Sequence, residues 1–233
     1  MEDSLSKRAG FGPVRCMITA AALFLTSQPL TAQQGLFGDD QPPPSVTLAS
    51  TDIRLDVPTP TTGNDFAALL AQASSGGLSE MKQEAAERFS NHLRQAMQER
   101  LRQYLRDEEV PLVEQGGQLT LHTQFDAGIS KQLTELKSSD RYETERGTLL
   151  IGGGFLYRLS SADGKSLREE RIDLGELRLQ PRYKVRTDLR SGEVEDSTDE
   201  AIEESLEKMA ERLLDRIEDQ LEADALRQFS AAG

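Results

Sequence analysis

Three consecutive glycines, Gly152–Gly154, are the residues whose type and spacing come nearest to a phosphate-binding loop. A dinucleotide loop needs Gly-x-Gly-x-x-Gly between a strand and a helix, and a P-loop ends in Gly-Lys-Ser/Thr. Here Phe155, Tyr157 and Leu159 follow at alternate positions, so a strand period of two continues through the glycines. We therefore predict a strand, in which the glycines mark a bulge, a bend or the close approach of another group.

Histidines and acidic clusters are the other candidates for chemistry. His92 and His122 are the only histidines, and neither has a second histidine at the spacing of a metal site. The acidic segment "DSTDE", 196–200, lacks the central glycine of a calcium loop. A nucleophile elbow of the form Gly-x-Ser-x-Gly is also missing from the sequence. We therefore expect no metal, no cofactor and no catalytic residue.

The N-terminal segment has the pattern of an export signal. Three basic residues precede the apolar run 16–26, and Ala32 follows as a small residue at a cleavage site. We predict that 1–32 is a cleaved signal peptide, with an uncleaved anchor as the alternative. Cys16 begins the apolar run and directly follows Arg15, whereas a lipidated cysteine comes after such a run, so Cys16 is not in a lipidation position and the mature chain would contain no cysteine. The expected location is the periplasm or the medium, without a transmembrane segment in the mature chain.

The net charge of the chain limits the classes of partner that it can bind. Lys and Arg number 27 against 40 Asp and Glu, which gives a net charge of −13. An acidic surface repels nucleic acid and anionic lipid headgroups, so we expect neither as a partner. Another envelope protein is the expected partner.

Two long amphipathic helices should cover the sheet that contains these residues. Apolar residues recur every four positions over 79–106. A second stripe, starting at Ile202, predicts a helix of about 28 residues, with Ser197 and Glu200 as its capping box. This second stripe can pack on a sheet, which we favour, or form a seam with a second copy of the chain.

Strands are predicted where apolar and polar residues alternate, at 51–58, 116–130 and 149–161. Asp163-Gly164 predicts a tight hairpin turn, and a charged return strand follows it. Apolar residues are sparse over 175–196, which predicts a long and partly extended connection.

These elements predict one α+β domain over 51–229. Its order is strand, helix, three strands, helix: an antiparallel sheet of about four strands with two long helices on one face. Residues 33–50, with three successive prolines, predict an extended tether. A short helix is expected at 65–73.

The strand and turn "FLYRLSSADGKSL", 155–167, and the helix from Thr198 carry a resemblance of layout. Over 52–226 the chain resembles small α+β proteins of the bacterial envelope, such as the lipopolysaccharide-assembly lipoprotein that plugs an outer-membrane barrel, and uncharacterised envelope lipoproteins. The chain departs from that family because it lacks a lipidated cysteine. The resemblance implies an envelope role and assigns no functional residue.

We therefore expect a non-catalytic exported protein that binds a partner or assists envelope assembly through protein contacts. Its candidate contact strand comprises Gly152, Gly153, Gly154, Phe155 and Tyr157, beside a sheet edge that could accept a partner strand. Two alternatives stay open. One is a hydrolase of envelope polymers that uses acidic residues, and the other is a structural protein that self-associates through the C-terminal helix.

Overall fold

A mixed β-sheet and its helices make up the part of the chain that this computed structural model describes, residues 42–59 and 77–232. These residues belong to one compact unit, which starts at Gln41. The predicted signal peptide, the predicted helix at 65–73 and residues 33–41 of the predicted tether lie outside the described residues.

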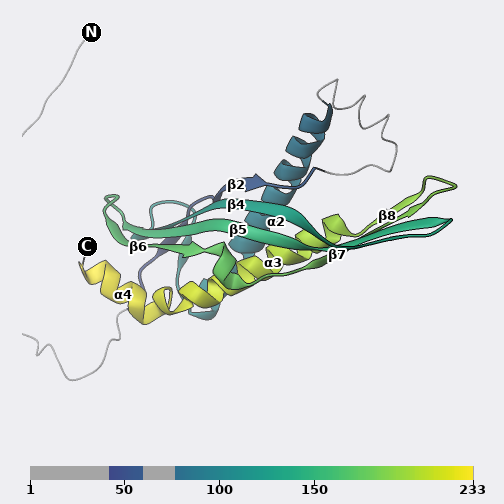
Figure 1. The fold of residues 1–233 in the computed structure, drawn as a ribbon. Helices are drawn as coiled ribbons and strands as arrows, with labels where there is room; N and C mark the ends of the chain where they lie inside the picture. Colours follow the sequence, from purple (N-terminus) through teal and green to yellow (C-terminus); the bar gives the residue numbers. More distant parts are fainter. Residues whose placement is uncertain (1–41, 60–76, 233) are drawn as a thin grey trace, which may run out of the picture. The chain divides into compact units, whose positions relative to one another are not determined.

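The sheet has eight strands in the described chain, and Figure 1 labels most of them. They are β1 (Val46–Leu48), β2 (Asp52–Asp56), β3 (Leu112–Val113), β4 (Leu119–Ser138), β5 (Tyr142–Ser161), β6 (Ser166–Asp173), β7 (Arg182–Asp188) and β8 (Val194–Asp196). The main order is β3-β1-β4-β5-β7-β8, while β2 also pairs with β4 and β6 with β5.

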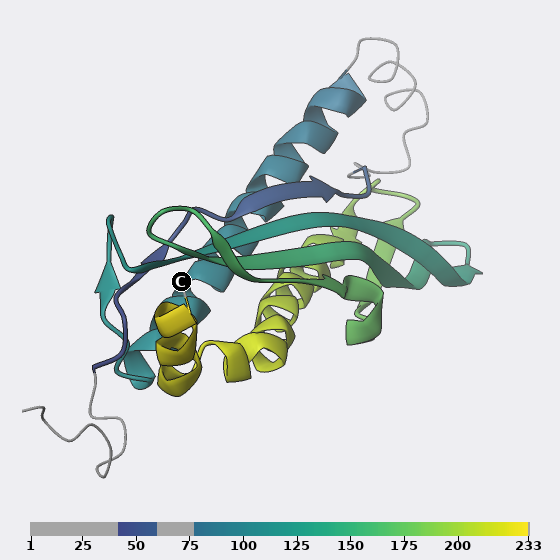
Figure 2. The ribbon, with the colours of Figure 1, turned by 90° about the vertical axis from the view of Figure 1, so that its left-hand side faces the viewer.

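The helices are α2 (Gly77–Asp107), α3 (Thr198–Ile217) and α4 (Ala223–Ala232), with short 3-10 turns η1 (Leu174–Leu177) and η2 (Glu218–Gln220). Figures 1 and 2 show α2 and α3 against one face of the sheet, which we call the inner face. The opposite, outer face carries no described helix. The α+β class is therefore correct.

The predicted sheet of about four antiparallel strands is wrong. The described sheet is larger and mixed, because β1 and β2 both pair with β4 in parallel, and β1 pairs with β3 in parallel. The alternation at 51–58 predicted β2 but not its parallel pairing, and β1 and β3 have only three and two residues, too few for a period of two to identify them. β1 lies inside the range predicted as a tether, and β7 and β8 lie inside the range predicted as a connection.

The core forms between the inner face and the helices. Phe125 on β4 and Phe155 on β5 are register partners, and their ring centroids are 4.8 Å apart. The stripe of α3 closes over them with side chains that are at most 1% exposed: Ile202, Leu206, Met209, Leu213 and Ile217. Since its own core covers this stripe, α3 presents no free apolar seam to a second copy.

The end of the chain differs from the prediction in two details. The helix predicted as one piece of about 28 residues is divided into α3 and α4 by η2. The predicted capping box is also wrong: the Ser197 hydroxyl donates to the carbonyl of Lys184 and accepts from its amide, so it makes no cap. The carboxylate of Asp196 accepts from the amide of Thr198 at 2.8 Å instead.

The central strand β5 is paired differently along its two halves. β6 pairs with 154–160 and β7 pairs with 142–148, both antiparallel and on the edge opposite β4. Between them, 149–153 have register partners on β4 alone among the described strands. The chain bypasses this stretch through η1, and the amide of Leu149 donates to the carbonyl of Pro181 at 2.9 Å.

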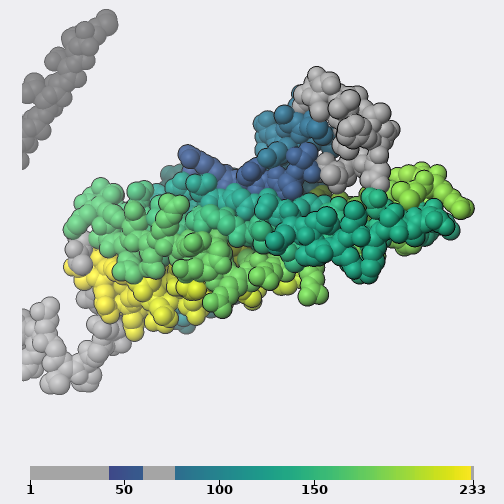
Figure 3. Space-filling model, viewed as in Figure 1, coloured from purple at the N-terminus to yellow at the C-terminus, as the bar shows by residue number. Residues whose placement is uncertain are grey.

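Beyond this break, the ends of β4 and β5 continue with β7 and β8 into an arm, defined as 129–148 and 182–196. Figures 1 and 3 show these strands extending past the helices that cover the rest of the sheet. Inner-face side chains at the arm's free edge are accordingly exposed, with Leu133 at 53% and Leu136 at 58%. The sheet therefore has a covered half and a projecting half.

Candidate functional site

The glycine run lies inside β5, at the boundary between the two halves. Strand alternation points Gly152 and Gly154 to the outer face, and Gly153 to the inner face with Phe155 and Tyr157. Phe155 and Tyr157 are 0% and 1% exposed. The predicted contact strand is thus divided: these two side chains belong to the core, Gly154 is buried beneath Arg171, and Gly152 is half-buried on the outer face.

Gly153 shows why glycine is needed in this strand. Its φ is +113°, and a Cβ at this position would lie 2.1 Å from the carbonyl oxygen of Asp126 on β4. Real side chains do not tolerate that distance from backbone, so Gly153 lets the two strands approach closely at a bend. The run continues as strand to Ser161, and no helix begins at it. The geometry of a phosphate loop, with amides at a helix N-terminus, is not present here.

The outer face above the run is hollow, and we call this hollow the glycine groove. Gly128 and Gly152 are register partners on β4 and β5, and a Cβ on either would have no atom within 4 Å. Two missing side chains opposite each other leave an open depression of about 610 Å³. Its walls include Asp56, Asp126, Ser130, Leu150 and Arg171.

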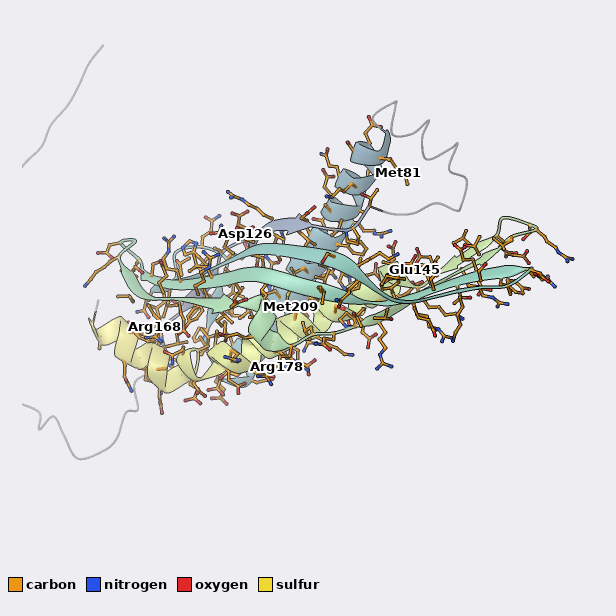
Figure 4. All side chains as sticks on the ribbon, viewed as in Figure 1. Met81, Asp126, Glu145, Arg168, Arg178 and Met209 are labelled. Carbon is orange, nitrogen blue, oxygen red and sulfur yellow. The ribbon has the colours of Figure 1, made fainter. Side chains whose placement is uncertain are left out.

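The walls of the groove are polar and mostly solvated. Asp56 on β2 forms an ion pair of 2.6 Å with Lys82, and the guanidinium of Arg171 lies over Gly154. Figure 4 places Asp126 on the side of the sheet away from α3. Leu150 is 44% exposed and gives the rim one large apolar contact. An acidic side and a basic side, with an apolar contact and bare backbone between them, can hold an extended polar chain.

Two carboxylates in one groove also meet one requirement of the hydrolase alternative. A glycosidase needs one carboxylic acid that keeps its proton near neutral pH, which takes burial or a neighbouring carboxylate without a cation. Asp56 has a side chain that is 72% exposed and pairs with Lys82. Asp56 is therefore solvent-exposed and already paired with a cation, and it lacks the buried environment that a general acid of this kind needs.

Neither histidine belongs to the groove. His92 on α2 faces Glu207 on α3, with 3.4 Å between Nε2 and the carboxylate oxygen. His122 lies on the outer face beside Arg158, and burial together with that cation lowers its pKa. Among the described residues, no group of three or more His, Cys, Asp or Glu side chains is arranged to hold a metal ion.

Sequence reasoning found the glycines of β5 but missed the other groove residues, Gly128, Asp56, Asp126 and Arg171. They come from three different strands, β2, β4 and β6, and only the register brings them together. One signal was available: Gly128 falls on the polar positions of a strand with clear alternation, where a glycine leaves the sheet bare.

No known protein family and no curated protein matches this chain. The fold is similar to solved structures of bacterial proteins at low identity. One is a homolog of a neuraminyllactose-binding hemagglutinin from Helicobacter pylori, with 11% identity, 85% of this chain and 97% of that chain covered, and a TM-score of 0.42. Another is a minor lipoprotein from Acinetobacter baumannii, with 14% identity, 76% and 94% covered, and a TM-score of 0.27.

A third is a lipoprotein from Neisseria meningitidis, with 12% identity, 76% of this chain and 99% of that chain covered, and a TM-score of 0.18. TM-scores below 0.5 carry no argument about function, so the proposals below are based on the chain's own residues. Within the described residues, no helix combines the length and the apolar character that membrane crossing requires.

Proposed function

We propose that this protein is a non-catalytic binding protein of the bacterial cell envelope, which holds an extended segment of an envelope protein in the glycine groove. The observation that carries the proposal is the pair of facing glycines, Gly128 and Gly152, on a sheet face that no described helix covers. The export signal predicted at 1–32 supports the envelope location.

The chemistry of the groove supports a polypeptide segment as its occupant. Backbone without side chains lets a second backbone approach closely. The groove can pair with both basic and acidic side chains of a bound segment. It offers the carboxylates of Asp56 and Asp126 on one side and the guanidinium of Arg171 on the other. Among the described residues that line the groove, none carries an aromatic ring, on which a sugar or a base would stack.

The test fills the groove without disturbing the fold. Because a side chain at Gly152 meets no atom within 4 Å, Gly152→Gln should fold normally and occupy the hollow. A photocrosslinking residue in place of Ser130, on the groove wall, should form an adduct in cells that maps to one segment of an envelope protein. The same residue in place of Glu84, exposed on α2, should not form it.

The adduct from Ser130 should be lost in Gly152→Gln and kept in Thr120→Gln, a matched change on the same outer face but outside the groove. Adducts that are equal from both positions, or that are unaffected by Gly152→Gln, would contradict the proposal. Hydrolysis of an envelope polymer that Asp126→Asn abolishes would support the enzyme alternative instead.

A further inference from the structure

The outer face of the arm has a charge opposite to that of the whole chain. Strand alternation and register place five cationic side chains on this face: Lys137, Arg146, Arg182, Lys184 and Arg186. The same rule places three carboxylates there: Glu135, Asp188 and Glu195. A chain with net charge −13 thus has a local excess of positive charge on one face of its projecting half.

The cations at the centre of this face border a hollow of about 650 Å³. Arg146, Arg182 and Lys184 line it together with one carboxylate, that of Glu135, and polar residues such as Thr148. Arg146 pairs with Glu135 at 3.1 Å. Neither Arg182 nor Lys184 has an acidic partner within 4 Å in the described chain, and both are exposed. Two of these cations are therefore free to meet an external anion.

Aromatic stacking holds the far end of the face in place. The guanidinium of Arg186 lies 3.9 Å from the centre of the Tyr142 ring, and that of Arg141 lies 5.0 Å from it. Arg141 also pairs with Asp188 at 3.1 Å. Because these arginines are already held by stacking and ion pairs, they lose less conformational entropy when they bind an anion. This part of the face is therefore preorganised.

We propose that the outer face of the arm docks on an anionic lipid surface, where its cations meet headgroup phosphates. Cations two residues apart on a strand are separated by about 7 Å, and neighbouring strands by about 5 Å. These cations are therefore spread over an open, two-dimensional area, which suits a planar array of phosphates. A single small anion would need cations that converge around one enclosed point.

The acidic part of the molecule does not oppose this orientation. The exposed carboxylates of α3, among them Glu204, Glu207 and Glu211, belong to the helical layer on the inner face. At physiological ionic strength charges are screened over about 8 Å. The attraction to the lipid surface therefore depends mainly on the charges of the face that contacts it. The net charge of −13 would prevent binding only if the negative charges were spread evenly over the surface.

The experiment compares two double variants of the full chain that change net charge equally. Arg182→Gln with Lys184→Gln removes the free cations of the arm. Lys165→Gln with Arg102→Gln removes two exposed cations elsewhere, in the β5–β6 turn and on α2. Binding is measured by co-sedimentation with phosphatidylcholine vesicles containing phosphatidylglycerol, at 50 mM salt, where screening is weak. Residues 1–41 are identical in all variants, so they cannot cause a difference between them.

Each Lys or Arg near an anionic surface contributes about 1 kcal/mol, or about five-fold in affinity. We expect the arm variant to bind about 25-fold more weakly than the wild type, and the control variant to bind like the wild type. With vesicles of phosphatidylcholine alone, the difference between the arm variant and the wild type should disappear. Equal loss in the two variants would overturn the proposal, as would release of the wild type by inorganic phosphate at constant ionic strength, which would indicate a free anion as the ligand.

Discussion

The two halves of the β4–β5 pair share one local pattern and have opposite environments. In the covered half, the inner-face side chains Phe125, Phe155 and Tyr157 are at most 1% exposed. In the arm, Leu133 and Leu136 lie on the same face of the same strand and are more than half exposed. The alternation of apolar and polar residues therefore produces a strand in both halves. Only the half that the helices cover buries its apolar side chains in the core.

The arm carries features that protect an uncovered strand from aggregation. A register shift between Leu133 and Glu135 bends its free edge, and Lys137 places an exposed charge along it. Bulges and lysines are the usual protection of exposed edges. The comparison thus assigns stability to the covered half, while the groove and the arm are the surfaces for which external contacts are proposed.

The largest expected effect is in the covered half. Phe125→Ala removes a fully buried ring that packs on Phe155, and should lower the free energy of unfolding by about 3–5 kcal/mol. Leu133→Ala removes an exposed side chain on the same face and should change it by less than about 0.5 kcal/mol. Urea unfolding of both variants measures the difference. Similar losses would mean that the arm is covered in solution.

The glycines at the boundary should give the next largest effect. Gly153→Ala forces a side chain into positive φ and against the backbone of β4, and should cost at least about 2 kcal/mol. Gly152→Ala enters open space and should stay within about 1 kcal/mol of the wild type. Thermal unfolding checks both. Equal tolerance at the two positions would show that the strands are not in close contact at Gly153.

A tyrosine in the helical layer should make the covered half sensitive to alkali. Burial and the nearby carboxylates of Glu108 and Glu222 raise the pKa of Tyr104 to about 12, and its hydroxyl donates to the carbonyl of Glu218 at 3.0 Å. A tyrosine in the unfolded chain titrates near 10.0. The unfolded state therefore loses this proton first, so the stabilisation is complete below pH 10 and declines between pH 10 and 12.

One such group contributes at most about 1.4 kcal/mol of decline per pH unit. Urea unfolding at pH 9, 10 and 11 should show a shallower decline for Tyr104→Phe than for the wild type. Parallel declines would indicate that Tyr104 titrates normally in the folded protein.

The smallest effect is expected from polar changes in the arm. Leu133→Ser with Leu136→Ser exchanges two exposed side chains and should shift the free energy of unfolding by less than about 0.5 kcal/mol. Circular dichroism during urea unfolding is sufficient to measure it. A loss above about 1 kcal/mol would place these leucines in a buried contact.

Strong periodicity made some elements predictable from the sequence. The helix expected at 79–106 is α2, and the strand expected through the glycines is β5, because each buries one face over many residues. The strand β7 has a detectable signal too, because Tyr183, Val185 and Thr187 alternate with charged residues, although Tyr183 and Val185 are its only two apolar residues.

The parallel pairing and the groove could not be predicted in the same way. β2 pairs with β4 across about 70 residues of sequence, and no local signal specifies that register. The groove depends on the same register, because Asp56 comes to lie opposite Gly128 only when the two strands pair. A site built from residues on different strands cannot be recognised in the sequence until the pairing of those strands is known.

Hydrogen exchange along β5 tests the central contrast most directly, because one strand passes through both halves. Amides of 155–160, paired with β4 and β6 under the helical layer, should exchange only through global unfolding. Amides of 142–147, equally paired but in the arm, should exchange much faster through local opening. Equal protection in the two segments would contradict the account.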